Sequence, residues 1–439
     1  MLQRVSIAQE MKERIAGNSF AIHDEKDLTP LMERIGDARI VMLGESSHGT
    51  HEYYTWRSRL SRRLITEKGF NFIAVEGDWP DCYLINRYIK GYTNEKGAAD
   101  VLRSFSRWPT WMWANWEIVA LCEWLRQHNT PLPADRRVGF YGLDIYSLWE
   151  SMRTIIDYLQ KVDPDAMKMA EQAFRCFEPY RDENGYNYAM ALRFAPELCE
   201  KEIMKLLRHV QKHRQYYDHD PEAAFSAEQN ARVAVNAEAY YRSMLAGGTA
   251  SWNARDTHMQ DTLEQLLSFH GHNSKAIVWA HNTHIGDAHF TDMRRDGMYN
   301  IGELSRSAFG NEQVVLVGFG CYKGSVIAGR RWGAPMEEME VPEAPPGSWE
   351  HGLYHYFDDD RLVLMNNMQD TPLAEKSQPH RAIGVVYDPA REKYGNYVPS
   401  VIAKRYDAFI FFRETRALHP LPVTVTDTVQ VPETYPFGV

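Results

Sequence analysis

The chain of 439 residues lacks the features that mark membrane, secreted and nucleic-acid-binding proteins. No apolar run approaches the length that spans a bilayer. Residues 1–20 carry charges throughout and have no apolar core of the kind found in a secretory signal. The net charge is −10, and no stripe of lysine and arginine overrides it. We therefore expect neither a membrane nor a nucleic acid among its partners.

Cysteine is scarce and never closely paired. The five cysteines are scattered, odd in number and in no C-x-x-C pair: Cys82, Cys122, Cys176, Cys199 and Cys321. This pattern favours reduced thiols that fill the core of a cytoplasmic protein, and it argues against a structural zinc site.

Several short enzyme motifs are also missing. The sequence contains neither the phosphate-binding pattern G-x-x-x-x-G-K-[ST] nor a G-x-G-x-x-G that follows a strand. It contains no nucleophile elbow G-x-S-x-G and no H-E-x-x-H zinc motif. We therefore predict no cofactor, and the serine-hydrolase route through the elbow is absent.

What the chain does have is a set of apolar strands that end in acidic or imidazole side chains. The segment 40–54 reads I-V-M-L-G-E-S-S-H-G-T-H-E-Y-Y, so its apolar run leads into Glu45, Ser46, Ser47 and His48. Three further runs, at 72–75, 138–141 and 276–280, lead into Glu76, Asp144, and the pair His281 and His284. In open α/β sheets, ligands bind beyond the carboxyl ends of the strands. We predict that these side chains share one crevice.

The order of the elements predicts an α/β fold. The strand candidates are continuous apolar runs, which are typical of parallel strands buried on both faces, and helical segments separate them. Residues 164–246 contain no convincing strand and read as a helical insertion over the active-site cleft. We expect a central, mostly parallel sheet flanked by helices, with core segments 1–163 and 247–439 on either side of the insertion 164–246.

Further elements follow from the same patterns. We expect strands at 313–319, 382–387 and 408–412, and helices at 148–159, 257–269 and 300–308. Prolines and glycine in 336–349 predict a long loop, and the tail after His419 is expected to be irregular.

The clustered residues suit the activation of water. A carboxylate beside His48 would fix the imidazole tautomer and stabilise the imidazolium as the ring takes a proton. A second imidazole, or Arg57, would donate to an oxyanion. Such parts support attack of water on a carbonyl, although Ser46 and Ser47 remain open as nucleophiles.

Two other interpretations of the same residues stay open. His48-x-x-His51 and His281-x-x-His284, followed by Asp287 and His289, offer ligands that zinc, manganese or iron accept. Five tryptophans between 108 and 124 pack a core or line a cleft. Trp108 and Trp111, which precede the expected helix, are the better candidates for the cleft.

At this point the sequence resembles the erythromycin esterase family. The matching motifs are Gly44-Glu45-Ser46-Ser47-His48-Gly49 with Glu52 and Arg57, Val75-Glu76-Gly77-Asp78, Trp279-Ala280-His281-Asn282-Thr283-His284, and Asn300-Ile301-Gly302-Glu303-Leu304. The resemblance runs from about residue 40 to residue 415. It implies a mostly parallel sheet with a helical subdomain over the cleft.

The resemblance also implies roles for the residues. His48 would be the general base that activates water, Glu45 and Glu76 would orient it or share its proton, and Arg57, His281 and His284 would complete the cleft. We expect Ser46, Ser47, Trp108, Trp111 and Asp144 to contact the substrate.

Characterised members of the family are hydrolases that open macrolide lactones without a serine nucleophile. This reaction gives resistance to macrolide antibiotics. We therefore expect a small ester or lactone as substrate and leave the oligomeric state open. Two alternatives remain: a metal-dependent hydrolase that uses the His/Glu cluster, and a non-catalytic binding protein in polysaccharide metabolism, since some members carry a succinoglycan label.

Overall fold

The computed structural model describes residues 12–180, 186–195, 198–213, 222–244, 247–365, 368 and 374–423. Within these residues nine strands form one sheet, and two more form a small antiparallel pair. The sheet strands are β1 (Ser19–Ala21), β2 (Ile40–Leu43), β3 (Phe72–Asp78), β4 (Gly139–Asp144), β5 (Ala276–Trp279), β6 (Val314–Gly329), β7 (Met336–Val341), β8 (Arg361–Leu364) and β11 (Ala408–Thr415). The small pair is β9 (Gln378–Arg381) with β10 (Tyr397–Ser400).

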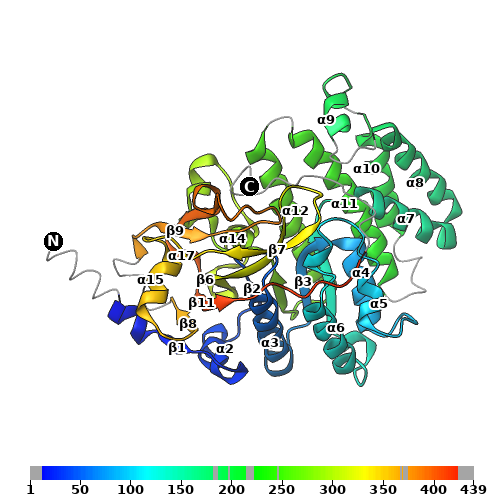
Figure 1. Cartoon of the computed structure of the whole chain (residues 1–439). Helices are drawn as coiled ribbons and strands as arrows, with labels where there is room; N and C mark the ends of the chain where they lie inside the picture. The colour runs from blue at the N-terminus through cyan, green and yellow to red at the C-terminus, as the bar shows by residue number, and fades with distance from the viewer. Residues whose placement is uncertain are drawn as a thin grey trace.

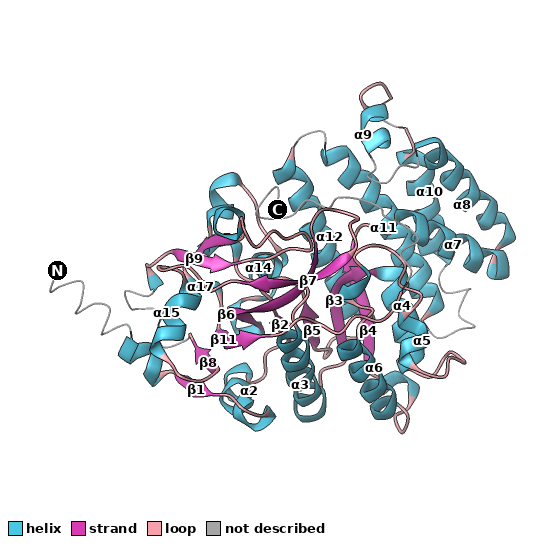
Figure 2. Ribbon diagram, viewed as in Figure 1, coloured by secondary structure: helices cyan, strands magenta, loops and turns pink. Residues whose placement is uncertain are grey.

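The middle of the sheet is parallel. The order is β1-β8-β11-β6-β2-β5-β3-β4, with β7 paired to β6 outside this path. The six strands from β11 to β4 are all parallel, whereas β1, β8 and β7 pair antiparallel at or near the edges. The mostly parallel central sheet expected from the sequence is confirmed (Figure 2).

Each central strand buries both of its faces, as its continuous apolar run requires. In β2, Val41 and Leu43 join one hydrophobic cluster, and Ile40 and Met42 join the cluster on the opposite face. This alternation is the two-residue period of a strand. Helices therefore have to cover both faces, which is the usual situation of a parallel sheet.

Two helical layers provide that cover (Figure 1). The first face is packed by α2 (Thr29–Ile35), α3 (His51–Lys68), α5 (Ala98–Leu102) and α6 (Trp116–Asn129), and by most apolar residues of α4 (Trp79–Ile89). The other face is packed by α12 (Gly248–Phe269), α13 (Asn282–Ile285), α14 (Ile301–Phe309), α15 (Trp349–Tyr356) and α17 (Ile402–Arg405). The short helix α16 (Glu392–Gly395) precedes β10.

A third group of helices gathers at one end of the molecule, beyond β3 and β4 (Figure 2). It consists of α7 (Leu148–Val162), α8 (Pro164–Phe177), α9 (Tyr186–Leu192), α10 (Glu200–His213) and α11 (Ala223–Met244). These helices share a hydrophobic cluster of their own. The described part of 164–246 is helical, and the proposed division at residues 163 and 246 stays a prediction.

Some expected elements differ from the structure. Residues 382–387 form only isolated bridges, Ser47 with Ile383 and Gly329 with Val386, because this run crosses the ends of the sheet strands. The expected loop at 336–349 begins with β7, which pairs with the extended second half of β6. Exposed glutamates occupy three of the six positions of β7, so its sequence contains no apolar run. The tail after residue 423 lies outside the described residues.

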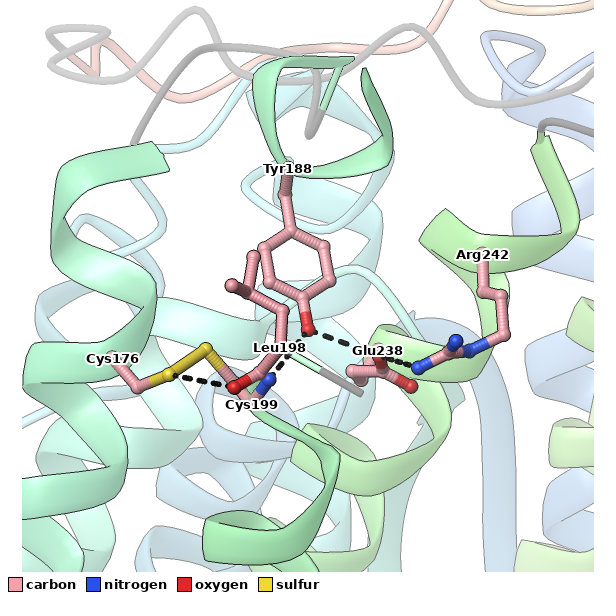
Figure 3. The surroundings of a disulfide bond; sticks show 6 residues. All are labelled: Cys176, Tyr188, Leu198, Cys199, Glu238 and Arg242. Carbon is pink, nitrogen blue, oxygen red and sulfur yellow. Dashed lines mark hydrogen bonds and ion pairs between the residues drawn. A yellow bond between two sulfur atoms is a disulfide. The ribbon is translucent and has the colours of Figure 1, made fainter. Parts of the chain in front are cut away.

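The prediction that all five cysteines are reduced is wrong for two of them. Cys176 at the end of α8 and Cys199 just before α10 form a disulfide (Figure 3). Beside it, the Tyr188 hydroxyl accepts from the Cys199 amide at 3.3 Å and donates to Glu238 at 2.9 Å. A separation of 23 residues carries no local pairing signal. Disulfides are rare in a reducing cytoplasm, so the cytoplasmic location stays a prediction.

The remaining cysteines, Cys82, Cys122 and Cys321, are free and buried, as expected of core residues. In the part of the chain that the structure describes, no helix combines the length and the apolar character that crossing a membrane requires.

Breaking the disulfide is expected to lower the free energy of unfolding of the helical group by about 3 kcal/mol, because a cross-link over such a separation restricts the unfolded chain. Guanidinium unfolding followed by circular dichroism, with and without dithiothreitol, measures the change. The variant Cys176→Ser/Cys199→Ser is the control and should not respond to the reductant. An equal response of both proteins would contradict the prediction.

Candidate active site

The four strands that end in acidic or imidazole residues are direct neighbours in the sheet. They lie in the order β2-β5-β3-β4, and neighbouring strands are in register up to Leu43 with Trp279, Trp279 with Val75, and Val75 with Gly142. After a bulge, β3 and β4 pair once more, at Asp78 and Asp144. The residues that follow the common register therefore come together at one edge of the sheet. This edge brings together the polar side chains that the sequence placed there.

His48 is held by a carboxylate and a guanidinium behind it. Its Nδ1 lies 2.9 Å from Oε1 of Glu45, and the other oxygen of Glu45 accepts from Arg57 at 2.6 Å. Arg57 is fully buried, with its guanidinium over the rings of Tyr54 and Trp279. The bond to Glu45 places a proton on Nδ1, which leaves Nε2 as the basic nitrogen of neutral His48.

The loop that carries His48 is fixed by close backbone packing. A side chain at Gly49 would meet the backbone oxygen of Ile327 at 1.9 Å, so only glycine fits between the loop and β6. The hydroxyl of Tyr54 donates to the carbonyl of His48 at 3.0 Å. These contacts set the position of the imidazole before any ligand arrives.

His281 lies against His48, with ring centroids 4.9 Å apart. Its Nδ1 accepts from the backbone amide of Thr283 at 3.3 Å, so the proton of the neutral ring resides on Nε2. Nε2 is buried and has no described residue in hydrogen-bond geometry, and the backbone of Ser46 is the polar group that acts on the ring from this side of the loop. Burial and the neighbouring His48 hold the pKa of His281 well below its usual value. His281 is therefore a neutral donor.

Arg255 of α12 joins two of the strand-end carboxylates. It makes a bidentate pair with Asp144, at 3.0 and 2.7 Å, and donates to Glu76 at 2.7 Å. The second oxygen of Glu76 accepts from the backbone amide of His281 at 2.8 Å. One buried guanidinium thus neutralises charge from both β3 and β4.

His284 is clamped between α12 and the strand ends. Its Nδ1 lies 2.9 Å from Asp256, and its Nε2 lies 3.1 Å from a nitrogen of Arg255, which donates. The ring stacks on Trp252 at 4.5 Å. These partners fix the orientation of His284 and place a cation beside its Nε2.

The pKa values of Glu76 and His48 follow from these contacts. Burial by itself would raise the pKa of Glu76, but His284, Arg255 and His48 outweigh it and hold the pKa well below its usual value. Burial by itself would lower the pKa of His48, but the charges of Glu76 and Glu45 outweigh it and raise the pKa. The site therefore keeps Glu76 ionised and makes His48 a stronger base than a free imidazole.

A cavity opens beside His48. It holds about 720 Å³ of space, part of it open to solvent. Its charged floor comes from the strand ends, and its rim is aromatic: Phe105, Trp108, Trp113, Tyr146 and Trp332. The indole nitrogen of Trp108 donates to the carbonyl of Ala334 at 2.8 Å, which ties the 105–113 segment to the β6–β7 connection.

Two further carboxylates lie in the cavity wall. Asp78 pairs with Arg107, and its Oδ1 is buried without a partner among the described residues. Burial raises the pKa of Asp78 to about 6, and burial together with the charge of Asp78 raises that of Asp81 to about 7. Perturbed carboxyl groups in a cavity are typical of functional sites.

Several residues singled out from the sequence lie away from the cavity. Ser46 hydrogen-bonds the hydroxyl of Tyr53 at 2.6 Å, and Ser47 pairs with Thr50, so both hydroxyls are buried and occupied. Trp111 packs edge-on against Trp108, behind the rim. The contact of these three residues with substrate stays a prediction. Trp108 and Asp144 do line the cavity.

The histidines of the metal interpretation do not form one centre. His51 turns to Glu117, at 2.6 Å, while His48 turns to Glu45. Asp287 pairs with Arg306, and His289 contacts Arg294. Arg255 next to His284 disfavours a metal cation at that ring nitrogen.

Sequence reasoning missed residues that come from helices. Arg255 and Asp256 belong to the site and lie on α12. This helix begins at Gly248, well before the helix expected at 257–269. Arg107, Asp81, Tyr146 and Trp332 also line the cavity. The one signal in the sequence was the charged pair Arg255-Asp256, which directly precedes the expected helix. Its place in the site becomes apparent only when that helix is extended towards its N-terminus.

Removing the guanidinium should destabilise the fold. Arg255→Gln leaves Glu76 and Asp144 buried without their shared cation, and we expect a loss of about 3–5 kcal/mol in unfolding free energy. Urea unfolding measures it. Arg175→Gln, which breaks the exposed pair with Glu171, is the control and should change stability by less than about 0.5 kcal/mol. Equal effects would show that the buried network contributes little.

Comparison with known proteins places the chain in a family. The chain is 25% identical over 353 residues to erythromycin esterase type II of Escherichia coli, a match that covers 74% of this chain and 80% of the relative. It is 23% identical to the putative hydrolase YbfO of Bacillus subtilis, over 69% of each chain.

Solved structures share the fold. The crystal structure of a succinoglycan biosynthesis protein matches with a TM-score of 0.78 at 20% identity, over 94% of this chain and 99% of that one. A mutant of the erythromycin esterase EreC in its open conformation matches with a TM-score of 0.67 at 15% identity, over 92% and 96%. The family model for erythromycin esterase matches residues 65–415, most of the chain, including Glu76, Arg255, His281 and His284. The chain therefore belongs to the erythromycin esterase family.

Proposed function

We propose that the protein hydrolyses a carboxylic ester or macrolactone with a water molecule that His48 activates. The observation that carries the proposal is His48 in the wall of the cavity, paired with Glu45 and with a neutral His281 beside it. Membership of the family supports a hydrolase of the macrolide esterase type.

The first step in this mechanism is deprotonation of water. Glu45 accepts a hydrogen bond from Nδ1–H of His48, so the free Nε2 takes a proton from water as the water oxygen attacks the carbonyl carbon. The imidazolium that forms is stabilised by Glu45 and by the nearby charge of Glu76. Arg57 touches Glu45 and lies behind it, so its contacts fit a positioning residue better than the oxyanion donor considered from the sequence.

The second requirement is a donor for the oxyanion. His281 fits this role because its pKa is lowered, its proton is on Nε2, and that atom has no partner among the described residues. A preorganised neutral donor gains a hydrogen bond as negative charge develops on the carbonyl oxygen. The imidazolium of His48 then returns its proton to the alkoxide that leaves. Glu76 holds the backbone of His281, and Arg255 holds Glu76.

Replacement of the base tests the mechanism. His48→Asn should lower turnover by about two to four orders of magnitude, with the fold intact by circular dichroism. Mass spectrometry of erythromycin, other macrolides and simple aryl esters measures the gain of one water. Ser46→Ala and Ser47→Ala are matched controls from the same loop and should retain most of the turnover.

Other outcomes would identify the alternatives. Undiminished turnover in His48→Asn would remove His48 as the base, and an acyl-enzyme that disappears in Ser46→Ala or Ser47→Ala would favour a serine nucleophile. Loss of activity on chelation, with recovery on adding metal, would favour metal-assisted hydrolysis. If wild type turned over none of the compounds, the macrolide esterase assignment would be withdrawn.

The pH profile provides a separate prediction. His48 acts as a base only when neutral, so kcat/KM should fall as the pH drops through the pKa of His48, which lies above its usual value of 6.5. Glu45→Gln removes a negative charge next to the ring, which lowers that pKa. The acid limb of the profile should therefore move to lower pH.

Glu67→Gln is the control for this measurement. Glu67 lies at the exposed end of α3 and pairs with Arg63, so its loss should leave the profile in place. If the acid limb of the kcat/KM profile does not move in Glu45→Gln, a group other than His48 determines that limb.

A further inference from the structure

A second cluster of potential ligands lies outside the cavity. It consists of His51, the first residue of α3, Glu117 in the first turn of α6, and His419 in the segment that follows β11. Their ligand atoms all lie within 4.8 Å of one another. One oxygen of Glu117 lies 2.6 Å from Nδ1 of His51 and 2.6 Å from Nδ1 of His419. Hydrolysis as described above uses none of these three side chains.

The chemistry of this cluster suits a transition-metal ion. Two imidazole nitrogens and one carboxylate oxygen form a common protein donor set for zinc, with a fourth position left for water. One oxygen of Glu117 faces both imidazole nitrogens, and an ion bound between them would replace the protons of these hydrogen bonds. Glu117 is nearly buried, with 3% of its side chain exposed, whereas 60% of His419 is exposed, so the site is open to an ion on one side.

The backbone around the cluster is already in place. The amide of His51 donates to the carbonyl of Arg416 at 2.8 Å, and the amide of Leu418 donates to the carbonyl of Gly49 at 3.0 Å. The amide of Trp116 donates to the carbonyl of His419 at 3.0 Å. The three ligands therefore sit on segments that are bonded to each other independently of their side chains. This preorganisation lowers the ordering cost of binding.

The distances need only a small adjustment. Ligand atoms around one tetrahedral zinc ion lie about 3.3 Å apart, given metal–ligand bonds of about 2.0–2.1 Å. The two contacts of Glu117 at 2.6 Å are somewhat shorter than that. Because 60% of the His419 side chain is exposed, its ring has room to rotate and lengthen its contact with Glu117.

We propose that His51, Glu117 and His419 bind a divalent ion of the zinc class, separate from the catalytic residues. The ion would join the segment after β11 to the starts of α3 and α6. His51 is three residues from His48 in the loop that enters α3. The site would therefore act as a clip that fastens the chain around the catalytic base.

The test uses the full chain after removal of metal by a chelator. Zinc is added, its stoichiometry and affinity are measured by elemental analysis and calorimetry, and cobalt is used in parallel because four-coordinate cobalt has a distinctive visible absorption. We expect one bound ion, and a weakening of at least about tenfold in His419→Gln and in Glu117→Gln. His272→Gln, which changes an exposed histidine in the connection from α12 to β5, is the control and should bind like wild type.

Two further results decide between sites. His281→Asn should keep the ion, because the clip does not use the catalytic histidines, and thermal unfolding of wild type should shift upwards with zinc while His419→Gln does not. Zinc binding that survives in both His419→Gln and Glu117→Gln would overturn the proposal, and so would an absence of binding at millimolar zinc. Either result is independent of whether the protein hydrolyses esters.

Discussion

The arrangement of the site depends on one buried ion pair network, that of Arg255 with Asp144 and Glu76. Parallel strands end at a common edge, so their polar termini crowd together, and carboxylates from β3 and β4 would repel each other there. The guanidinium of α12 reaches both and pairs bidentately with Asp144. With this charge in place Glu76 stays ionised, receives the backbone amide of His281 and raises the pKa of His48. Helix, strands and the two imidazoles are thus linked by one cation.

The proposed mechanism gives the two imidazoles different roles because their surroundings differ. His48 has an anion on its Nδ1 and a second anion nearby, and both favour its protonated form. His281 has a backbone donor on its Nδ1 and the potential charge of His48 beside it, and both favour the neutral form. Two identical side chains at 4.9 Å can therefore serve as a base and a donor in the proposed mechanism. Neither assignment needs a nucleophile from the protein.

Much of the central sheet was predictable, and the reason is local. The runs that became β2, β3, β4 and β5 are apolar throughout because both faces are buried, and each is followed by the residues that form the site. The strand β7 escaped prediction because its glutamates face solvent. Residues 382–387 were wrongly predicted to be a strand, because an apolar segment that crosses the strand ends has the same composition as a strand. Arg255 was missed because its partners lie 111 and 179 residues away, and no local pattern reports such a pairing.

The two parts of the cavity lining differ in how well they tolerate substitution. Its floor is fixed by the sheet register and by buried charges, and a substitution there disturbs several partners at once. Part of its aromatic lining is formed by Trp108 and Trp332 from two connecting segments; their ring centroids lie 4.3 Å apart, and the Trp108 indole donates to the carbonyl of Ala334. Exchanging or lengthening those segments reshapes the entrance while the proton-handling residues keep their positions. The same architecture can therefore diversify in the molecules it admits without having to evolve its chemistry anew.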